Sequence, residues 1–325
     1  MVQGGPVVQV GIILATVVGL WIGARLLVDA AVRLARRVGL SELTIGLTIV
    51  AAGTSMPELV VTTDAALNGL GDIAVGNVVG SSIYNLAVVL GVISALRFIP
   101  IERSLVHRDG IALLAATLVS VGTALDGEVT RVEGLALVGL FVAYTAYLLR
   151  SGTEDPTRST SDAPVGVLPA VTDRVEFRGR DAAVLVAGLV VVLVSGDLMV
   201  AAASGLARGV GISEWIIGGT IVAAGTSTPE VAVSLVAVRQ GRLGVSVGNV
   251  VGSNVFNLVG VLGLAAAVRP VSLSGAATPS LWWLLAITVA VVAALWTGRQ
   301  LSRLEGGLLV GSEVVRWVLS LLDIV

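Results

Sequence analysis

Two glutamates, Glu58 and Glu230, stand in the middle of long apolar stretches, each at the end of a Gly-Thr-Ser-x-Pro-Glu motif. Even translocon scales put the cost of an acidic side chain at mid-membrane at about 2.5–3.5 kcal/mol, so such a residue usually faces a cavity, a partner or an ion. Because the two glutamates occupy equivalent positions, we expect them to share one cation site.

The residues before each glutamate supply further oxygen ligands. Pro57 and Pro229 lack an amide hydrogen, so they should break their helices and free the backbone carbonyls of Gly53 and Gly225. Broken backbone is tolerated at this depth only inside protein or around a cavity. Carbonyl, hydroxyl and carboxylate oxygens are the donors that calcium and sodium prefer. The hydroxyl ligands predicted here are Thr54, Ser55, Thr226 and Ser227.

A second motif, Gly-Asn-Val-Val-Gly-Ser-x-x-x-Asn-Leu, also occurs twice. It places Ser81 four residues before Asn85, and Ser253 four residues before Asn257, a spacing that puts each pair on one helical face. The glycines of the motif allow a neighbouring helix to approach closely. We therefore add these four polar residues to the predicted site.

Each feature alone has a simpler explanation. A hydroxyl in a spanning helix usually bonds its own backbone, a glycine usually serves packing, and a membrane proline is commonly only a kink. A single carboxyl could be neutral or paired with Arg25 or Arg316. The combination of glycine, hydroxyl, proline and carboxylate, present twice, favours the cation site.

The two motifs belong to an internal repeat that covers nearly the whole chain. Glu42 and Glu214 begin matching stretches 172 positions apart (214 − 42), and the same shift relates Gly76 to Gly248 and Arg131 to Arg303. We expect a first repeat over residues 1–150 and a second over 181–325, with their most closely matching stretches at 42–91 and 214–263. A period this long is typical of a duplicated transporter half.

Composition places the chain in lipid. Its 325 residues are 55% hydrophobic and 13% charged, against about 45–50% and about 25% in soluble domains. No basic stretch precedes the first apolar run, so we expect a spanning helix there and not a cleaved signal peptide. Six runs suit spanning helices, and four weaker runs bring the expected total to ten. The strong runs are 8–28, 73–95, 133–149, 181–204, 244–266 and 279–297, and the weaker ones are 43–67, 110–125, 215–238 and 304–322.

The expected fold is therefore an all-α polytopic membrane protein with ten transmembrane helices in two five-helix repeats. An odd number of spans per repeat requires the second to enter from the opposite face, so the repeats should be inverted. Fifteen arginines fall at one set of helix ends and only three, Arg131, Arg208 and Arg269, at the other, which predicts both termini outside. The polar segment 151–180 should be a disordered cytoplasmic linker.

These motifs resemble the alpha-repeat signatures of the sodium/calcium exchanger family, within the calcium/cation antiporters. The resemblance covers both halves and is specific, because both motifs recur at the right separation. It implies an inverted-repeat exchanger of the cell membrane with Glu58 and Glu230 as central ligands and the eight hydroxyl and amide residues completing the sites. It also implies that helices one and six slide against the rest, and that sodium influx drives calcium efflux.

One departure concerns charge. Similar prokaryotic exchangers often carry an aspartate where this chain has Asn257, so the site keeps only Glu58 and Glu230, with a maximum formal charge of −2. That charge balances one Ca²⁺ or two Na⁺. Asp64 has Val236 as its equivalent and is expected to be an interfacial acid, and His107 lies in a charged loop.

Other functions stay open at this point. Coupling to protons or a dependence on potassium would suit the same fold, and a channel is compatible with broken helices. A membrane enzyme lacks support, because a metallohydrolase would need histidine ligands or a clustered triad and the chain has one histidine and no cysteine. We expect no cofactor, no nucleic acid and no obligate protein partner; the expected partners are the bilayer and the transported cations.

Overall fold

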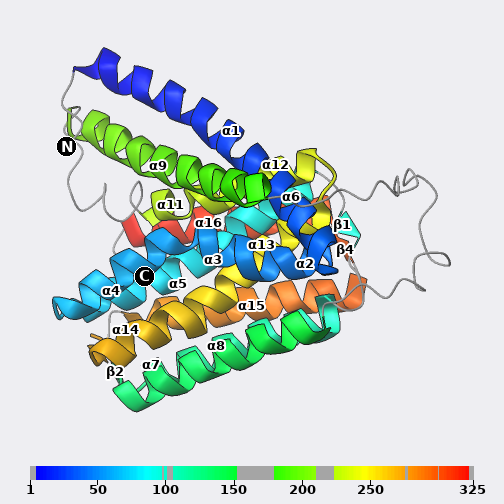
Figure 1. The fold of residues 1–325 in the computed structure, drawn as a ribbon. Coiled ribbons are helices and arrows are strands. Elements are labelled where there is room, and N and C mark those ends of the chain that lie inside the picture. The colour runs from blue at the N-terminus through cyan, green and yellow to red at the C-terminus, as the bar shows by residue number, and fades with distance from the viewer. Residues whose placement is uncertain are drawn as a thin grey trace.

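The computed structural model describes residues 5–96, 99–100, 105–151, 179–209, 223–274, 277–298 and 300–321. Helices make up almost all of this part of the chain, and the strands in it are two-residue pieces (Figure 1). The expected all-helical class is confirmed. Most of the predicted linker, residues 152–178, lies outside the described residues, as do residues 215–222 of the predicted weaker run 215–238.

The first half contains eight α-helices, three wider π-helical segments and two strands within its described residues. They are α1 (Pro6–Val38), α2 (Glu42–Ile45), η1 (Gly46–Val50), α3 (Ala51–Thr54), α4 (Met56–Leu67), α5 (Gly71–Tyr84), η2 (Asn85–Val89), α6 (Leu90–Leu96), β1 (Ile99–Pro100), η3 (Leu105–Gly110), α7 (Ile111–Ala124), β2 (Glu128–Val129) and α8 (Arg131–Ser151).

The second half repeats much of this order where it is described. Its elements are α9 (Gly179–Gly209), α11 (Ala223–Thr226), α12 (Thr228–Arg239), α13 (Leu243–Val255), η5 (Phe256–Val261), α14 (Leu262–Val268), β3 (Val271–Ser272), α15 (Thr278–Gly298), β4 (Gln300–Leu301) and α16 (Arg303–Leu321).

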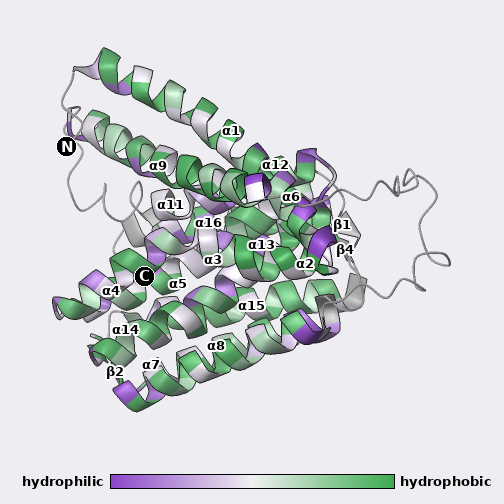
Figure 2. Ribbon diagram, viewed as in Figure 1, coloured by the Kyte–Doolittle hydropathy of each residue, from purple (hydrophilic) through white to green (hydrophobic). Residues whose placement is uncertain are grey.

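Within the described residues, six helical segments are long and apolar enough to cross a membrane, and the bent pair Glu42–Thr54 and Met56–Leu67 makes a seventh if it is taken as one span. The chain is thus a multi-pass membrane protein. Helices α7 and α16 lie where two of the weaker runs were predicted, but α7 has only 14 residues, so the total of ten spans stays a prediction. Figure 2 shows hydrophobic residues along the outer helices, and exposed apolar side chains such as Val132 and Leu308 suit contact with lipid.

Local sequence explains where the helices begin and end. Helix α1 starts with Pro6 in its first turn, where the missing amide hydrogen costs nothing, and ends at Gly39 in the left-handed conformation (φ 70°). Arg36 and Arg37 lie in its last turn, where they complement the helix dipole. The predicted breaks are present in both halves: α3 ends at Thr54 and α4 begins at Met56, and α11 ends at Thr226 and α12 begins at Thr228. Each proline lies in the first turn after its break.

The two halves are packed crosswise. Helix α8 of the first half packs on α14 of the second, and α16 of the second packs on α6 of the first. Glycines bring the helices together, because a Cβ on Gly134 would lie 2.7 Å from the carbonyl oxygen of Gly263, and a Cβ on Gly306 would lie 2.5 Å from that of Gly91. Each contact is the other shifted by 172 positions with the halves exchanged.

The pairing of the short strands and of the two long helices is also unchanged when each residue is replaced by its equivalent 172 positions away. Strand β1 pairs with β4 and β2 pairs with β3, both antiparallel, and the shift of 172 converts one pairing into the other. Helices α1 and α9 lie side by side along much of their length (Figure 1). Helix α13 occupies the interior, with every residue from Val245 to Val255 buried. Several contacts between the halves therefore come in pairs that the shift of 172 positions exchanges.

Candidate functional site

Both glutamates are placed by the helix breaks. Glu58 lies in the first turn of α4 and Glu230 in the first turn of α12, and both are fully buried. The N-terminal turn of a helix carries unpaired amide hydrogens and the positive end of the helix dipole, so it favours a negative charge. The proline that interrupts each span thus creates, deep in the protein, a helix start that suits a carboxylate.

Reciprocal hydrogen bonds join the two glutamates across the halves. The Ser55 hydroxyl donates to Glu230 Oε1 at 2.8 Å, and the Ser227 hydroxyl donates to Glu58 Oε1 at 3.1 Å. A serine hydroxyl has one hydrogen, so a serine that donates to a carboxylate keeps its lone pairs for another partner. The other carboxylate oxygens, Oε2 of Glu58 and of Glu230, are buried and accept no hydrogen bond from the described residues.

Four more predicted hydroxyl residues lie around this pair. Ser253 Oγ lies 3.4 Å from Glu230 Oε1 and 3.5 Å from Thr54 Oγ1, and Ser81 Oγ lies 3.5 Å from Thr226 Oγ1. The two 3.5 Å contacts are equivalent under the exchange of halves. Their length is at the limit for a hydrogen bond, so they show proximity more than strong bonding. The structure thus brings the six predicted hydroxyls and the two glutamates into one cluster.

The predicted amides, Asn85 and Asn257, lie on π-helical segments next to this cluster. Asn85 begins η2 and Asn257 lies in η5; η2 contacts the helix that carries Glu230, and η5 contacts the helix that carries Glu58. Both side chains are fully buried, and neither their amide nitrogens nor their oxygens bond another described residue. A buried polar group left without a partner costs about 1–3 kcal/mol. Single-turn π-helical bulges are frequent at functional sites.

These atoms can hold a hard cation. Within the described residues no three or more His, Cys, Asp or Glu side chains gather in one place, so the donors are two carboxylates and neutral oxygens. Neither glutamate forms an ion pair there, because Arg316 bonds Glu313 at 2.9 Å and Arg25 lies over the Trp21 ring. The pairing of a glutamate with Arg25 or Arg316, considered from the sequence, is not what the structure shows.

Two buried or half-buried asparagines next to the glutamates, Asn77 and Asn249, were not predicted from the sequence. Asn77 Nδ2 donates to the Glu58 carbonyl oxygen (3.3 Å) and to Thr62 Oγ1 (2.9 Å). Asn249 Nδ2 donates to the Glu230 carbonyl oxygen (3.4 Å) and to Ser234 Oγ (3.0 Å). The second motif was interpreted through its glycines, serine and final asparagine. The first asparagine of the motif, Asn77 in one copy and Asn249 in the other, could have been predicted because the same amide side chain occurs in an apolar span in both halves.

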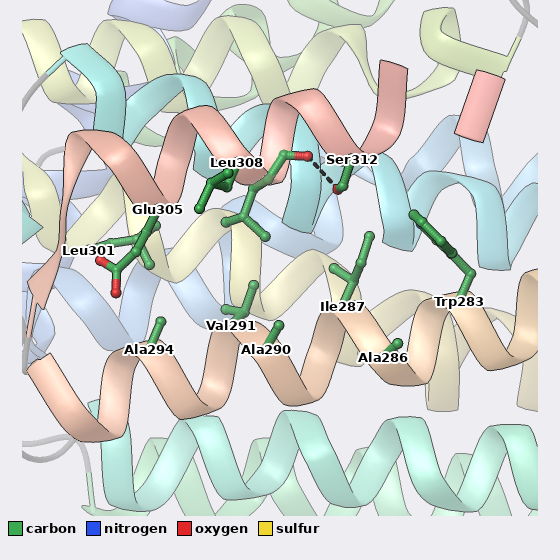
Figure 3. Close-up of a pocket in the computed structure, with 11 residues that line it drawn as sticks. Trp283, Ala286, Ile287, Ala290, Val291, Ala294, Leu301, Glu305, Leu308 and Ser312 are labelled. Carbon is green, nitrogen blue, oxygen red and sulfur yellow. Dashed lines mark hydrogen bonds between the residues drawn. The ribbon is translucent and has the colours of Figure 1, made fainter. Parts of the chain in front are cut away.

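Other polar residues lie away from the site. Asp64 is exposed and accepts a hydrogen bond from Asn68 Nδ2 at 3.2 Å, and the His107 ring packs against Trp296 with centroids 4.8 Å apart. A groove of about 350 Å³ between α15 and α16 is lined mostly by apolar side chains, with Glu305 and Ser312 as its charged and hydroxyl residues (Figure 3). Its walls offer few oxygen ligands, so it does not compete with the buried cluster as a cation site.

Comparison with known proteins finds similarity to sodium/calcium exchangers and antiporters. The family described as sodium/calcium exchanger protein matches residues 8–150 and 181–319. The protein CaxA of Alkalimonas amylolytica is 34% identical over 311 residues, 93% of this chain and 95% of that protein. The sodium/calcium exchanger MaX1 of Methanosarcina acetivorans is 30% identical over 87% of this chain and 90% of its own length. A structure of the sodium-calcium exchanger NCX_Mj soaked with Na⁺ and Ca²⁺ superposes with a TM-score of 0.82 at 27% identity, covering 96% of this chain and 98% of that one.

Proposed function

Because the chain belongs to the sodium/calcium exchanger family of cation antiporters, we propose that it exchanges Ca²⁺ for Na⁺ across the cell membrane at the cluster around Glu58 and Glu230. The ions are its cargo, so it is a transporter and no enzyme. The proposed ligands are the ten residues predicted from the two motifs: Glu58, Glu230, Thr54, Ser55, Ser81, Asn85, Thr226, Ser227, Ser253 and Asn257.

One observation carries the proposal. Two buried carboxylates from different halves each accept a serine hydroxyl from the opposite half, and each keeps one buried oxygen that no described residue bonds. A buried charge is stable only when it is paired or holds a cation. The unbonded amide atoms of Asn85 and Asn257 extend the set of oxygen donors beyond the glutamates.

Exchange follows from competition for these ligands. Ca²⁺ takes six to eight oxygen ligands in flexible geometry, which a mixture of carboxylates, hydroxyls and amides can supply. A formal charge of −2 is neutralised by one Ca²⁺ or by two monovalent cations, so one cargo binds well only when the other has left. Alternating access then brings the occupied site to each face in turn, with α1 and α9 sliding against the rest.

The proposed topology has ten spans in two inverted repeats, with both termini outside and residues 151–180 in the cytoplasm. The exchanged packing of α8, α14, α16 and α6 supports a two-fold relation between the halves. The collection of fifteen arginines at one set of helix ends supports the orientation. The positions of the termini can be measured by accessibility of single cysteines, because the chain has none of its own.

The experiment is uptake of radiolabelled Ca²⁺ into proteoliposomes that contain the purified protein. Vesicles are loaded with Na⁺, with an equal concentration of K⁺, or with buffer that imposes a pH gradient. We expect uptake only when Na⁺ leaves the vesicle. Uptake that follows the pH gradient and ignores Na⁺ would move the protein to proton-coupled exchange, and uptake that needs K⁺ together with Na⁺ would make it a potassium-dependent exchanger. Single-channel currents would indicate a pore.

A further inference from the structure

The geometry points to Asn249 as a positioning residue, which turns the Thr54 hydroxyl so that its lone pairs face the cation. Asn249 lies on α13, is fully buried, and is not among the ligands predicted from the motifs. The inference deepens the proposed function, since it rests on a cation bound between Glu58 and Glu230.

Three hydrogen bonds hold the Asn249 side chain in one orientation. Its Nδ2 donates to the Glu230 carbonyl oxygen at 3.4 Å and to Ser234 Oγ at 3.0 Å, and its Oδ1 lies 3.1 Å from Thr54 Oγ1. If the amide were flipped, its oxygen would face the carbonyl oxygen of Glu230, and two acceptors would repel each other. The amide oxygen therefore points toward Thr54, and Thr54 must be the donor in that bond.

The hydroxyl of Thr54 has one hydrogen, and two acceptors lie nearer to it than Ser253 Oγ, which is 3.5 Å away. Asn249 Oδ1 is the nearer at 3.1 Å, and the carbonyl oxygen of Ala51, one turn back on the same helix, is 3.3 Å away. Hydroxyls in spanning helices usually bond a carbonyl of their own helix. Asn249 supplies an alternative acceptor from the other half of the protein, and the hydrogen directed at it leaves the lone pairs of Thr54 for the cluster that contains Glu230 and Ser253.

Asn249 also connects this hydroxyl to a glutamate. Through the Glu230 carbonyl it fixes the start of α12, and through Thr54 it fixes the end of α3, so ligands from the two halves are held by one amide. Asn77 repeats the two donor bonds in the first half, to the Glu58 carbonyl and to Thr62. Ligands that are held in place before the ion arrives lose less entropy when it binds.

The test measures equilibrium binding of Ca²⁺ to the purified, detergent-solubilised protein, which does not depend on the coupling ion. Asn249→Ala should raise the Kd for Ca²⁺ about tenfold, the usual consequence of losing a hydrogen bond that orients a ligand. The maximal uptake rate at saturating Ca²⁺ should change less than about twofold, because a positioning residue alters affinity more than the later steps.

The dependence on Thr54 separates positioning from simple packing. In a Thr54→Ala background, Asn249→Ala should change the Kd less than about threefold, because the hydroxyl that it orients is gone. In a Thr54→Ser background, which keeps a hydroxyl, the tenfold effect should return. An equal effect of Asn249→Ala in all three backgrounds would overturn the inference.

The matched control is Ser246→Ala. The Ser246 hydroxyl donates to the Ser234 carbonyl oxygen at 2.9 Å, so it also joins α13 to α12, yet neither it nor its partner is a ligand in the proposed site. Its removal should leave the Kd within about twofold. If Asn249→Ala fails to fold, Asn249→Leu keeps the same branched arrangement of side-chain heavy atoms without the three hydrogen bonds and should give the same tenfold change.

Failure of the two proposals can be told apart. If the unaltered chain binds Ca²⁺ and Asn249→Ala binds it equally well, only the role of Asn249 is wrong. If the unaltered chain binds Ca²⁺ with the expected dependence on Asn249 but takes up none under a Na⁺ gradient, only the coupling is wrong. If it binds no divalent cation, both proposals fall.

Discussion

The hydrogen bonds at the centre of the molecule are matched between the halves, whereas the ion pairs near one end of its helices are not. At the centre, the bond from Ser55 to Glu230 has its counterpart in the bond from Ser227 to Glu58, and Asn77 repeats the donor bonds of Asn249. The two ion pairs that join the halves in the described part of the chain have no such counterparts. Arg242 bonds Glu42 at 2.9 Å and Arg33 bonds Asp181 at 2.8 Å, and the positions equivalent to Arg242 and Arg33 are Leu70 and Gly205.

The difference separates two requirements. In the proposed exchange, a site that is reached from both faces in turn needs similar ligands from both halves, which agrees with the matched residues at the centre. The ion pairs at the ends of the helices only need to keep the helices at one face of the protein together or to allow them to separate. Both ion pairs lie where α1 ends, α2 and α13 begin and α9 begins, near β1 and β4 (Figure 1). This end of the molecule is therefore tied by charge in a way that the matched positions at the other end cannot reproduce.

The largest effect is expected from the glutamates. Glu58→Gln and Glu230→Gln should each reduce Ca²⁺ uptake at least about a hundredfold, because an amide cannot neutralise a buried divalent cation. Uptake by folded protein in proteoliposomes is the measurement, and Asp64→Asn, at an exposed position, is the control that should stay active. A large loss from one glutamate and a small loss from the other would break the symmetry of the site.

The matched glycines should come next, as losses of stability. Gly134→Ala and Gly306→Ala each place a methyl group within 2.5 Å of backbone atoms of the opposite half, which should cost about 2 kcal/mol in the free energy of unfolding. Denaturation in detergent can measure both. Gly139→Ala and Gly311→Ala on the same helices meet no described atom within 4 Å and should be neutral. Unequal losses at Gly134 and Gly306 would show that the crosswise contacts are not equivalent.

A smaller and equal effect is expected from the two serines. Ser55→Ala and Ser227→Ala each remove one hydrogen bond to a carboxylate and one oxygen ligand, so each should raise the Kd for Ca²⁺ about tenfold, or about 1.4 kcal/mol. Calorimetric titration of the purified protein gives both values. Ser312→Ala, whose hydroxyl bonds the Leu309 carbonyl of its own helix, should leave the Kd unchanged. A difference of more than about fivefold between Ser55→Ala and Ser227→Ala would mean that the halves bind the ion unequally.

The unmatched ion pairs should give the smallest effect. Arg242→Leu should lower the free energy of unfolding by about 0.5 kcal/mol, because the pair with Glu42 is about one-third exposed and solvent screens it. The exchanged variant, Glu42→Arg with Arg242→Glu, should restore most of the loss. Labelling of a cysteine introduced on α13 would show whether this end opens more often in Arg242→Leu. Equal labelling with and without the ion pair would argue that charge does not hold this end closed.

The sequence predicted the helix breaks and the cluster of hydroxyls better than the contacts at the ends of the helices. Proline and glutamate in one motif were enough to predict the breaks before Pro57 and Pro229, and the repeat brought all six hydroxyls to the same cluster. Asn77 and Asn249 were missed because only the glycines, the serine and the final asparagine of their motif were interpreted. The pair of Arg33 and Asp181 joins residues 148 positions apart outside any motif, and β1–β4 joins two-residue strands from different halves. Contacts of this kind depend on how the helices meet, which local patterns do not contain.

The crosswise packing also has a consequence for the time course of synthesis. The ribosome completes α6 and α8 long before it reaches α16 and α14, and Gly134 precedes Gly263 by 129 positions (263 − 134). The glycine-containing faces of α6 and α8 therefore lack their final partners for a time in the bilayer. The helices of the second half, in contrast, are synthesised when their partners are already present. The contacts α8–α14 and α6–α16 are equivalent in the finished protein, but only the first half is synthesised before its partners. The newly made first half is therefore the more exposed to mispairing and to proteolysis.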